Sequence, residues 1–142
     1  MDARLILERN VEAVLGITMS FPHDYCATFA RDVIKDAHGI DVLGNRFGGE
    51  FAETEADAYR AYPLGLAVTA ARRMREIGWR KIPPVEAAFG DFAVVRVHGY
   101  GHGIAVAIGG GWFCRRLARG VRFDTSNHVV ACWTPQGDAS WQ

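Results

Sequence analysis

Residues 20–30 read SFPHDYCATFA, and this segment predicts a cysteine in the first turn of an amphipathic helix. Asp24 is a good N-cap residue, and the apolar spacing predicts a helix over residues 25–38 that ends at Gly39. Unpaired backbone N–H groups and the positive end of the helix dipole favour an anion there, and a thiolate is an anion. Cys26 is therefore a candidate nucleophile, and the alternative is a cysteine that packs as a small apolar group.

The composition is that of an ordinary globular domain. The chain has 142 residues, of which 49% are apolar and 23% charged, so we expect one domain over residues 1–135 and a polar tail over 136–142. Lys+Arg and Asp+Glu are both 16, which disfavours nucleic acid as a partner. No apolar run approaches the roughly 20 residues of a membrane span, and the N-terminus lacks a signal-peptide core. We therefore expect a protein made in the cytoplasm, with its three cysteines reduced.

The apolar periodicity changes along the chain. Helical spacing predicts helices over residues 5–15 and 25–38, from about Leu66 to Ile77, and a short one after Thr54. The later segments are rich in β-branched and aromatic residues, with glycines between them. They predict strands at residues 92–97, 104–108, 112–117, 121–123 and 129–133. Helices followed by strands with tight turns indicate an α+β fold with an antiparallel sheet.

A helix-borne cysteine nucleophile needs a general base, and histidine suits that role near neutral pH. His102 is the best candidate, because it opens a predicted strand after a glycine-rich turn, and Gly103 leaves room for a substrate backbone. His98 at the other end of that turn is the reserve. His38 fits a C-terminal capping role, and His23 precedes the Cys26 helix.

Three segments in order resemble the motifs of NlpC-type cysteine peptidases. Residues 24–29 (DYCATF) resemble the nucleophile motif, with one residue inserted between Asp and Cys. Residues 90–95 (GDFAVV) and 102–109 (HGIAVAIG) are similar to two strands of that family, the second carrying its histidine. The resemblance spans roughly residues 20–133, and the Cys-to-His separation of 76 residues (102 − 26) also fits.

This resemblance implies a papain-like α+β fold, with the Cys26 helix packed on the antiparallel sheet. It implies a peptidase that hydrolyses peptide bonds of cell-wall peptidoglycan, in the branch found among tail genes of phages and gene-transfer particles. The expected partners are then peptidoglycan peptides and tail-tip or hub proteins, in a virion that delivers DNA. Asp24, Tyr25 and Gly103 are candidate substrate-binding residues. We expect no cofactor and no metal, because no CxxC or HxxxH spacing supports a metal site.

Two departures from the family pattern leave an alternative open. A third polar residue should orient the catalytic histidine, but counting from His102 places Cys114 or Arg115 there, and neither is a good acceptor. Asp124 or Asn127 could replace it, and Asp124 is the candidate that we carry forward. The inserted residue Tyr25 is the second departure. The alternative is a catalytically inactive tail-tip component that retains the papain-like fold.

Overall fold

Helices precede strands in the computed structural model, which describes residues 2–15, 25–43, 65–97, 101–117 and 119–136. Residues 25 and 26 are described by their backbone alone. The helices are α1 (Ala3–Val14), α2 (Tyr25–His38) and α4 (Leu66–Glu76). The α+β class predicted from the sequence is confirmed. The predicted cap at Asp24 and the predicted helix after Thr54 lie outside the described residues.

Glycines end two of the helices, as the sequence predicts. Gly39 has a φ of +73° and donates its N–H to the carbonyl of Lys35 at 2.8 Å. After α4, Gly78 has a φ of +76°, and the N–H of Trp79 reaches back to the Met74 carbonyl at 2.9 Å. This pattern is a Schellman motif, in which a left-handed residue satisfies the last carbonyls of a helix.

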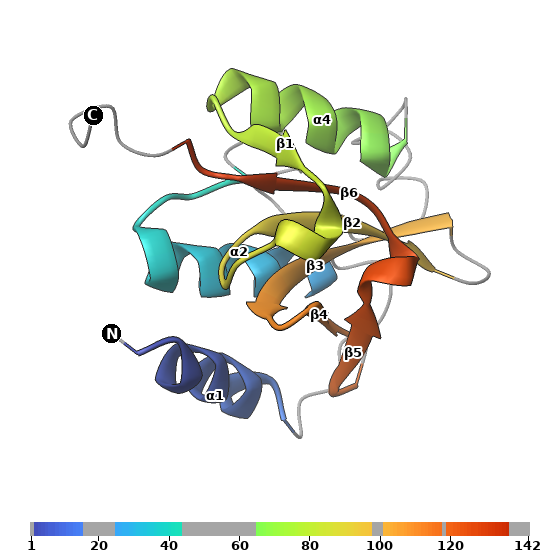
Figure 1. The fold of residues 1–142 in the computed structure, drawn as a ribbon. Helices are drawn as coiled ribbons and strands as arrows, with labels where there is room; N and C mark the ends of the chain where they lie inside the picture. Colours follow the sequence, from blue (N-terminus) through green and yellow to red (C-terminus); the bar gives the residue numbers. More distant parts are fainter. Residues whose placement is uncertain (1, 16–24, 44–64, 98–100, 118, 137–142) are drawn as a thin grey trace.

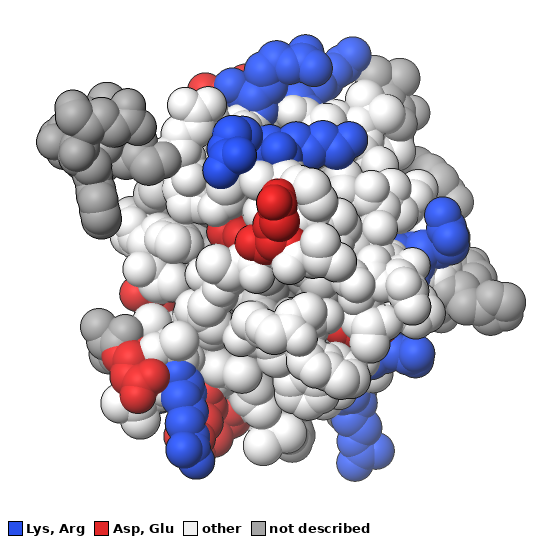
Figure 2. All heavy atoms as spheres, in the orientation of Figure 1, with Lys and Arg blue, Asp and Glu red and all other residues white. Residues whose placement is uncertain are grey.

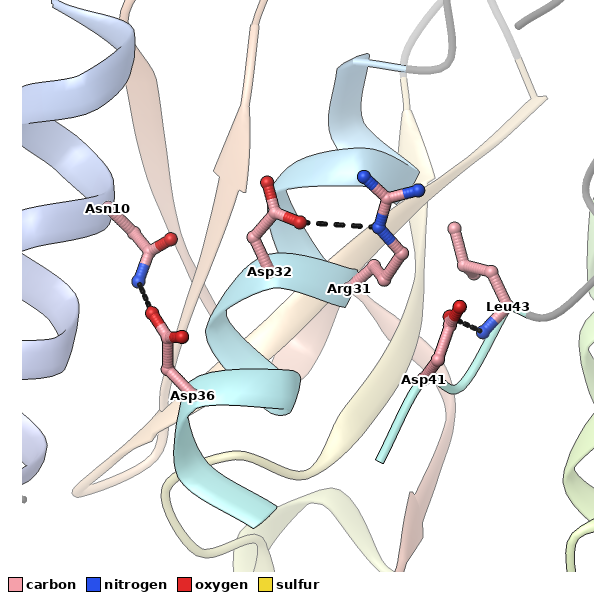
Figure 3. A network of polar contacts seen from close by, with 6 residues as sticks. All are labelled: Asn10, Arg31, Asp32, Asp36, Asp41 and Leu43. Carbon is pink, nitrogen blue, oxygen red and sulfur yellow. Dashed lines mark hydrogen bonds and ion pairs between the residues drawn. The ribbon is translucent and has the colours of Figure 1, made fainter. Parts of the chain in front are cut away.

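Polar contacts tie the helices to one another and to the segment after α2. The Asn10 amide of α1 donates to Asp36 of α2 at 2.9 Å (Figure 3). The Arg73 guanidinium of α4 donates to the carbonyls of Val42 and Asp41, at 2.7 and 3.1 Å. These bonds fix α1 against α2 and hold the chain after α2 close to α4.

Six strands form one antiparallel sheet in the order β1-β6-β2-β3-β4-β5. Figure 1 shows α2 across one side of the sheet, α1 outside α2, and α4 close to β1. Two short 3-10 turns, η1 (Pro84–Glu86) and η2 (Ser126–His128), lie between strands. The strands are β1 (Arg80–Ile82), β2 (Phe92–Val97), β3 (Gly101–Gly109), β4 (Trp112–Arg116), β5 (Val121–Thr125) and β6 (Val129–Thr134).

Both faces of the sheet are buried at the middle strands, because successive side chains alternate between faces and residues 92–95 and 103–107 are all buried. The helix-facing core joins α2 to Phe92 and Val94 of β2 and to Ile104 and Val106 of β3. The opposite core contains the intervening residues, Ala93, Val95, Ala105 and Ala107, together with Phe113, Ile82 and Cys132. This separation assigns each residue of β2 and β3 to one face.

The sequence missed β1, and several predicted boundaries differ by one to three residues from the structure. β1 has three residues, and only Ile82 among them is buried, so its pattern was too short to recognise. β3 begins at Gly101, three residues before the predicted strand, and β5 continues to Thr125. These ends consist of glycine and polar residues that show no apolar alternation, and backbone pairing with neighbouring strands extends them.

Candidate active site

His102 is the second residue of β3, on the face of the sheet that packs against the helices. Ile104 and Val106 of the same strand belong to the helix-side core, so the alternation of side chains assigns His102 to that face. The residue is exposed, whereas Ile104 and Val106 are fully buried. β3 therefore presents an accessible imidazole just beyond the edge of the helix-side core.

The C-terminal end of α2 lies near the C-terminal end of β3. A Cβ built on Gly90 would lie 2.6 Å from His38 Nε2 and 3.2 Å from the Cβ of Ala37, so Gly90 adjoins the last turn of α2. The N–H of Gly90 donates to the carbonyl of Ala107 in β3 at 2.9 Å. Figure 1 shows that the other end of α2 points toward the beginning of β3.

Chain geometry then brings Cys26 and His102 to the same end of this helix–strand pair. Cys26 is the second residue of α2, about 17 Å from Ala37 at about 1.5 Å per residue. His102 lies about 17 Å from Ala107 at about 3.4 Å per residue. Because α2 packs on β3, these two lengths give the backbone at Cys26 and the residue His102 similar estimated heights on the same side of the sheet.

The other two cysteines are poor nucleophiles. Cys114 and Cys132 are both fully buried as free thiols. Burial raises the pKa of Cys114 to about 12, with a further increase from the charge of Asp124. Burial likewise raises the pKa of Cys132 to about 12, and the nearby Asp91 adds to it. Since the thiolate is the reactive form, neither of these two cysteines is a candidate nucleophile, and Cys26 is the candidate that remains.

Asp124 is not brought together with His102. It pairs across β4 and β5 with Phe113, which belongs to the core on the opposite face of the sheet. Its two carboxylate oxygens accept from Arg115 at 2.9 Å and from Arg122 at 3.2 Å, and the side chain is only 4% exposed. These contacts give Asp124 a structural role, in which it joins two arginines across adjacent strands.

At the two predicted positions, 114 and 115, β4 carries no suitable acceptor for the His102 imidazole. Cys114 pairs with Val106 rather than with His102, because an antiparallel hairpin pairs residues at equal distances from its turn. Arg115 follows on the other face, bonded to Asp124. Among the described residues, no hydrogen bond reaches the His102 imidazole.

Asn127, the other candidate for this role, lies in η2 and is exposed. η2 packs against β2, the strand that pairs with the His102 end of β3. Val129 follows η2 and pairs with Val95, so η2 lies toward the same end of the sheet as His102. Asn127 is therefore better placed than Asp124, although no hydrogen bond between it and a described residue joins it to the site.

The structure describes two of the three predicted substrate-binding residues, Tyr25 and Gly103. Asp24 lies outside the described residues, as do His23 and His98, and Tyr25 is the first residue of α2. Gly103 is buried, and a Cβ there would lie 2.9 Å from Val97 Cγ2. The absence of a side chain at Gly103 therefore has a packing explanation, which is close contact with β2.

The sequence analysis did not identify two residues that lie near the site. The hydroxyl of Thr28, two residues beyond Cys26, is buried and has no hydrogen-bond partner among the described residues. Arg96 is the residue of β2 that pairs with His102. The alternation of β2 places Arg96 on the helix-facing side, and a charged residue in an otherwise apolar strand was the available clue.

Two runs of the sequence are rich in arginine, residues 72–75 (RRMR) and 115–116 (RR), and three of these arginines have structural roles. Arg73 bonds to backbone carbonyls, Arg115 pairs with Asp124, and Arg116 is buried. Figure 2 shows Lys and Arg side chains gathered over α4 and β1. The exposed members of this surface are Arg72, Arg75, Arg80 and Lys81.

Within the described ranges, no three His, Cys, Asp or Glu side chains are grouped so as to hold a metal ion. None of the helices described by the structure is long and apolar enough to cross a membrane.

The molecule is thus an α+β protein with a cysteine at a helix N-terminus and an exposed histidine on the adjacent strand. Residues 4–134 match the model of a domain of unknown function, DUF6950, and the chain belongs to this family. No curated protein matches the chain.

Proposed function

We propose that this protein is an NlpC-like cysteine peptidase with a papain-like fold, acting on peptide bonds of peptidoglycan. The observation that carries the proposal is the position of Cys26 and His102 at one end of the α2–β3 pair. Two further observations support it. Cys114 and Cys132 are buried with raised pKa values, and His102 remains exposed.

The proposed reaction uses the thiol of Cys26 and the imidazole of His102. The Cys26 thiolate attacks the carbonyl carbon of the scissile amide, and backbone N–H groups of the first turn of α2, which have no partner within the helix, stabilise the oxyanion. The C–N bond breaks as the His102 imidazolium donates a proton to the leaving amine. Water, deprotonated by His102, then hydrolyses the thioester and releases the acid and the Cys26 thiol.

Digestion of purified peptidoglycan by the full chain tests this proposal, with the release of amino groups as the measurement. We expect Cys26→Ala to abolish release and His102→Ala to lower the rate about 100-fold or more. His38→Ala is the matched control, because it removes an imidazole at the opposite end of α2. Unchanged release by Cys26→Ala would show that the nucleophile is misassigned.

The biological setting follows from the same resemblance and is also a proposal. The protein would be incorporated in the tail of a phage or gene-transfer particle, bound to tail-tip or hub proteins, and act during DNA delivery. Co-purification of the chain with assembled particles tests this setting. Its absence from particles that contain the other tail components would contradict it.

A specific observation favours a second candidate function, a tail component without catalysis. No hydrogen bond among the described residues orients the His102 imidazole. A histidine that nothing orients is a weak general base, since its tautomer and rotamer are not fixed. This candidate predicts that the wild-type chain and Cys26→Ala both fail to release amino groups, while both still bind the assembled tail.

A further inference from the structure

We propose that the edge of β5 that faces away from β4 is an interface, at which two copies of this chain pair through an antiparallel β5–β5 ladder. The two-fold axis of this pairing passes through Phe123, the central residue of the strand. One continuous sheet then runs through both copies, from β1 of the first to β1 of the second. This inference is independent of the proposed peptidase function.

The two outer strands of the described sheet, β1 and β5, differ in how their edges are protected. β1 has three residues, Lys81 is one of them, and Pro83 follows the strand. Short length, lysine and proline are devices that stop an edge strand from pairing with another chain. Figure 1 shows β5 at the margin of the sheet, beyond β4. β5 has five residues without lysine or proline, and its register with β4 is regular throughout, so its edge lacks these devices.

The hydrogen bonding between β4 and β5 determines which backbone groups point to this edge. The N–H of Leu117 donates to the carbonyl of Gly120 at 3.0 Å, so these residues form a hydrogen-bonded pair. Hydrogen-bonded and non-hydrogen-bonded pairs alternate along an antiparallel ladder. Val121, Phe123 and Thr125 are therefore in non-hydrogen-bonded pairs with β4, and their N–H groups point away from it. Among the described residues, β4 is the only strand that pairs with β5, so another strand can accept these donors.

The apolar side chains of β5 match one another when two copies pair about Phe123. Phe123 then lies opposite its own counterpart, and the two residues exchange a pair of N–H···O bonds. Val121 lies opposite Thr125 of the second copy, so β-branched residues meet on each side of the axis. The side chain of Phe123 is 50% exposed in the single chain, although it shares a face with Cys114 of the helix-side core. Pairing would cover this aromatic ring with a second one.

The charged residues of β5 are complementary in the same register. Arg122 lies opposite Asp124 of the second copy, in a non-hydrogen-bonded pair that brings the two side chains close. Opposite charges directly across two strands stabilise their pairing, whereas like charges oppose it. Within one chain, Asp124 accepts from Arg115 and from the exposed Arg122, so exchange of the two Arg122 side chains between copies keeps both carboxylate oxygens bonded. The segment VRFDT is thus self-complementary about its centre, as a two-fold interface requires.

Sedimentation equilibrium of the full chain tests this interface. We expect a reversible monomer–dimer equilibrium that stops at the dimer, because the two-fold pairing uses the free edge of both copies. Phe123→Glu places two like charges at the axis and should raise the dimer dissociation constant about 30-fold or more, as for the loss of a central interface residue. Val85→Glu is the matched control, because Val85 is an exposed apolar residue of η1, which contacts β6, and this change should leave the dissociation constant unaltered.

Three sedimentation results would overturn the proposal. A wild-type chain that stays monomeric at about 1 mM, where even weak complexes are populated, would leave the edge of β5 to a strand of another protein. A dimer that Phe123→Glu does not weaken would have its contact elsewhere on the surface. Assembly that continues beyond the dimer would exclude a closed two-fold contact.

Disulfide cross-linking tests the register directly, on a Cys26→Ala background because the other two cysteines are buried. Phe123→Cys places two thiols opposite each other, at a Cα separation of about 5.5 Å that suits a disulfide. We expect mild oxidation to give a covalent dimer of this variant. Val121→Cys is the matched control on the same edge, and it should give little covalent dimer because it lies opposite Thr125. Equal yields from the two variants, or no covalent dimer from Phe123→Cys, would overturn the pairing about Phe123.

Discussion

The carboxyl group of Asp91 is buried at the start of β2, where it joins two segments of the chain. It accepts the N–H of Ala88 at 2.8 Å and the hydroxyl of Thr134 at 2.7 Å. Burial raises the pKa of Asp91, while these hydrogen bonds and the charges of His38 and Arg80 act in the opposite direction. The Gly-Asp motif at the head of β2 thus has a structural explanation in hydrogen bonding.

Substitution of Asp91 should change both stability and its dependence on pH. Asp91→Ala leaves the N–H of Ala88 and the hydroxyl of Thr134 without this acceptor, and should cost about 1–3 kcal/mol in the free energy of unfolding. Asp91→Asn keeps the volume but has one acceptor oxygen in place of two, so a smaller loss is expected. Urea unfolding of the three proteins at neutral pH measures these differences.

The pH dependence follows from the raised pKa of Asp91. An acid whose folded-state pKa lies above its ordinary value of 3.8 contributes stability that is present below that value and is lost as pH rises through the folded pKa. The stability advantage of the wild type over Asp91→Asn should therefore shrink from pH 4 upward. An advantage that grows with pH would show that the folded protein favours the ionised carboxylate.

At the scale of elements, the turn before β2 fixes where α2 ends against the sheet. Gly90 has a φ of +88°, and it lies so close to His38 and Ala37 that a side chain would meet both. Its N–H also bonds to Ala107 of β3. The glycine therefore permits the close approach that sets the height of α2, and with it the level of Cys26 relative to His102.

Gly90→Ala should be more destabilising than the same change at a glycine with open space around it. Gly120 is the matched control, with a φ of +77° and no atom within 4 Å of an added Cβ. Both changes place an alanine in a left-handed backbone conformation, which should lower the free energy of unfolding by about 1–2 kcal/mol. Gly90→Ala should lower it further, because the added Cβ overlaps with α2. Thermal unfolding measures the difference, and equal losses at the two positions would mean that α2 does not rest on this turn.

The ion pairs between β4 and β5 form a second element-scale feature. Because Asp124 is buried between Arg115 and Arg122, Asp124→Ala leaves Arg115, which is 11% exposed, without its partner. We expect a loss of about 3–5 kcal/mol in the free energy of unfolding, the usual cost of breaking a buried pair. The reactivity of the Cys26 thiol, measured under conditions where the variant is folded, should stay unchanged. If the variant is stable and its Cys26 thiol is less reactive, Asp124 contributes to the candidate active site after all.

At the scale of the whole molecule, much of the fold could be predicted from the sequence. The apolar spacing of α2 and the glycines at positions 39 and 78 predicted helix ends that the structure confirms within one residue. β2 and β6 are rich in β-branched and aromatic residues, and both were predicted. The helices carry their own signal because one face of each is buried, and the strands carry theirs in their β-branched and aromatic composition.

The parts that could not be predicted depend on contacts between distant segments. β1 exists because it pairs with β6, and its three residues have no periodic pattern. The location of Asp124 depends on the β3–β4–β5 register, in which an irregularity between Ala107 and Gly109 intervenes. A shift of one residue moves every side chain of a strand to the other face, so sequence counting could not assign Asp124 to its side of the sheet.

The measurement that tests the central claim most directly is the rate of Cys26 alkylation as a function of pH. Cys114 and Cys132 are buried and should not react in the folded protein, and Cys26→Ala identifies the Cys26 signal. The account predicts an apparent thiol pKa well below the free value of about 8.5, which moves upward in His102→Ala and stays unchanged in His38→Ala. An apparent thiol pKa near 8.5 that is the same in wild type and His102→Ala would contradict the Cys26–His102 pair.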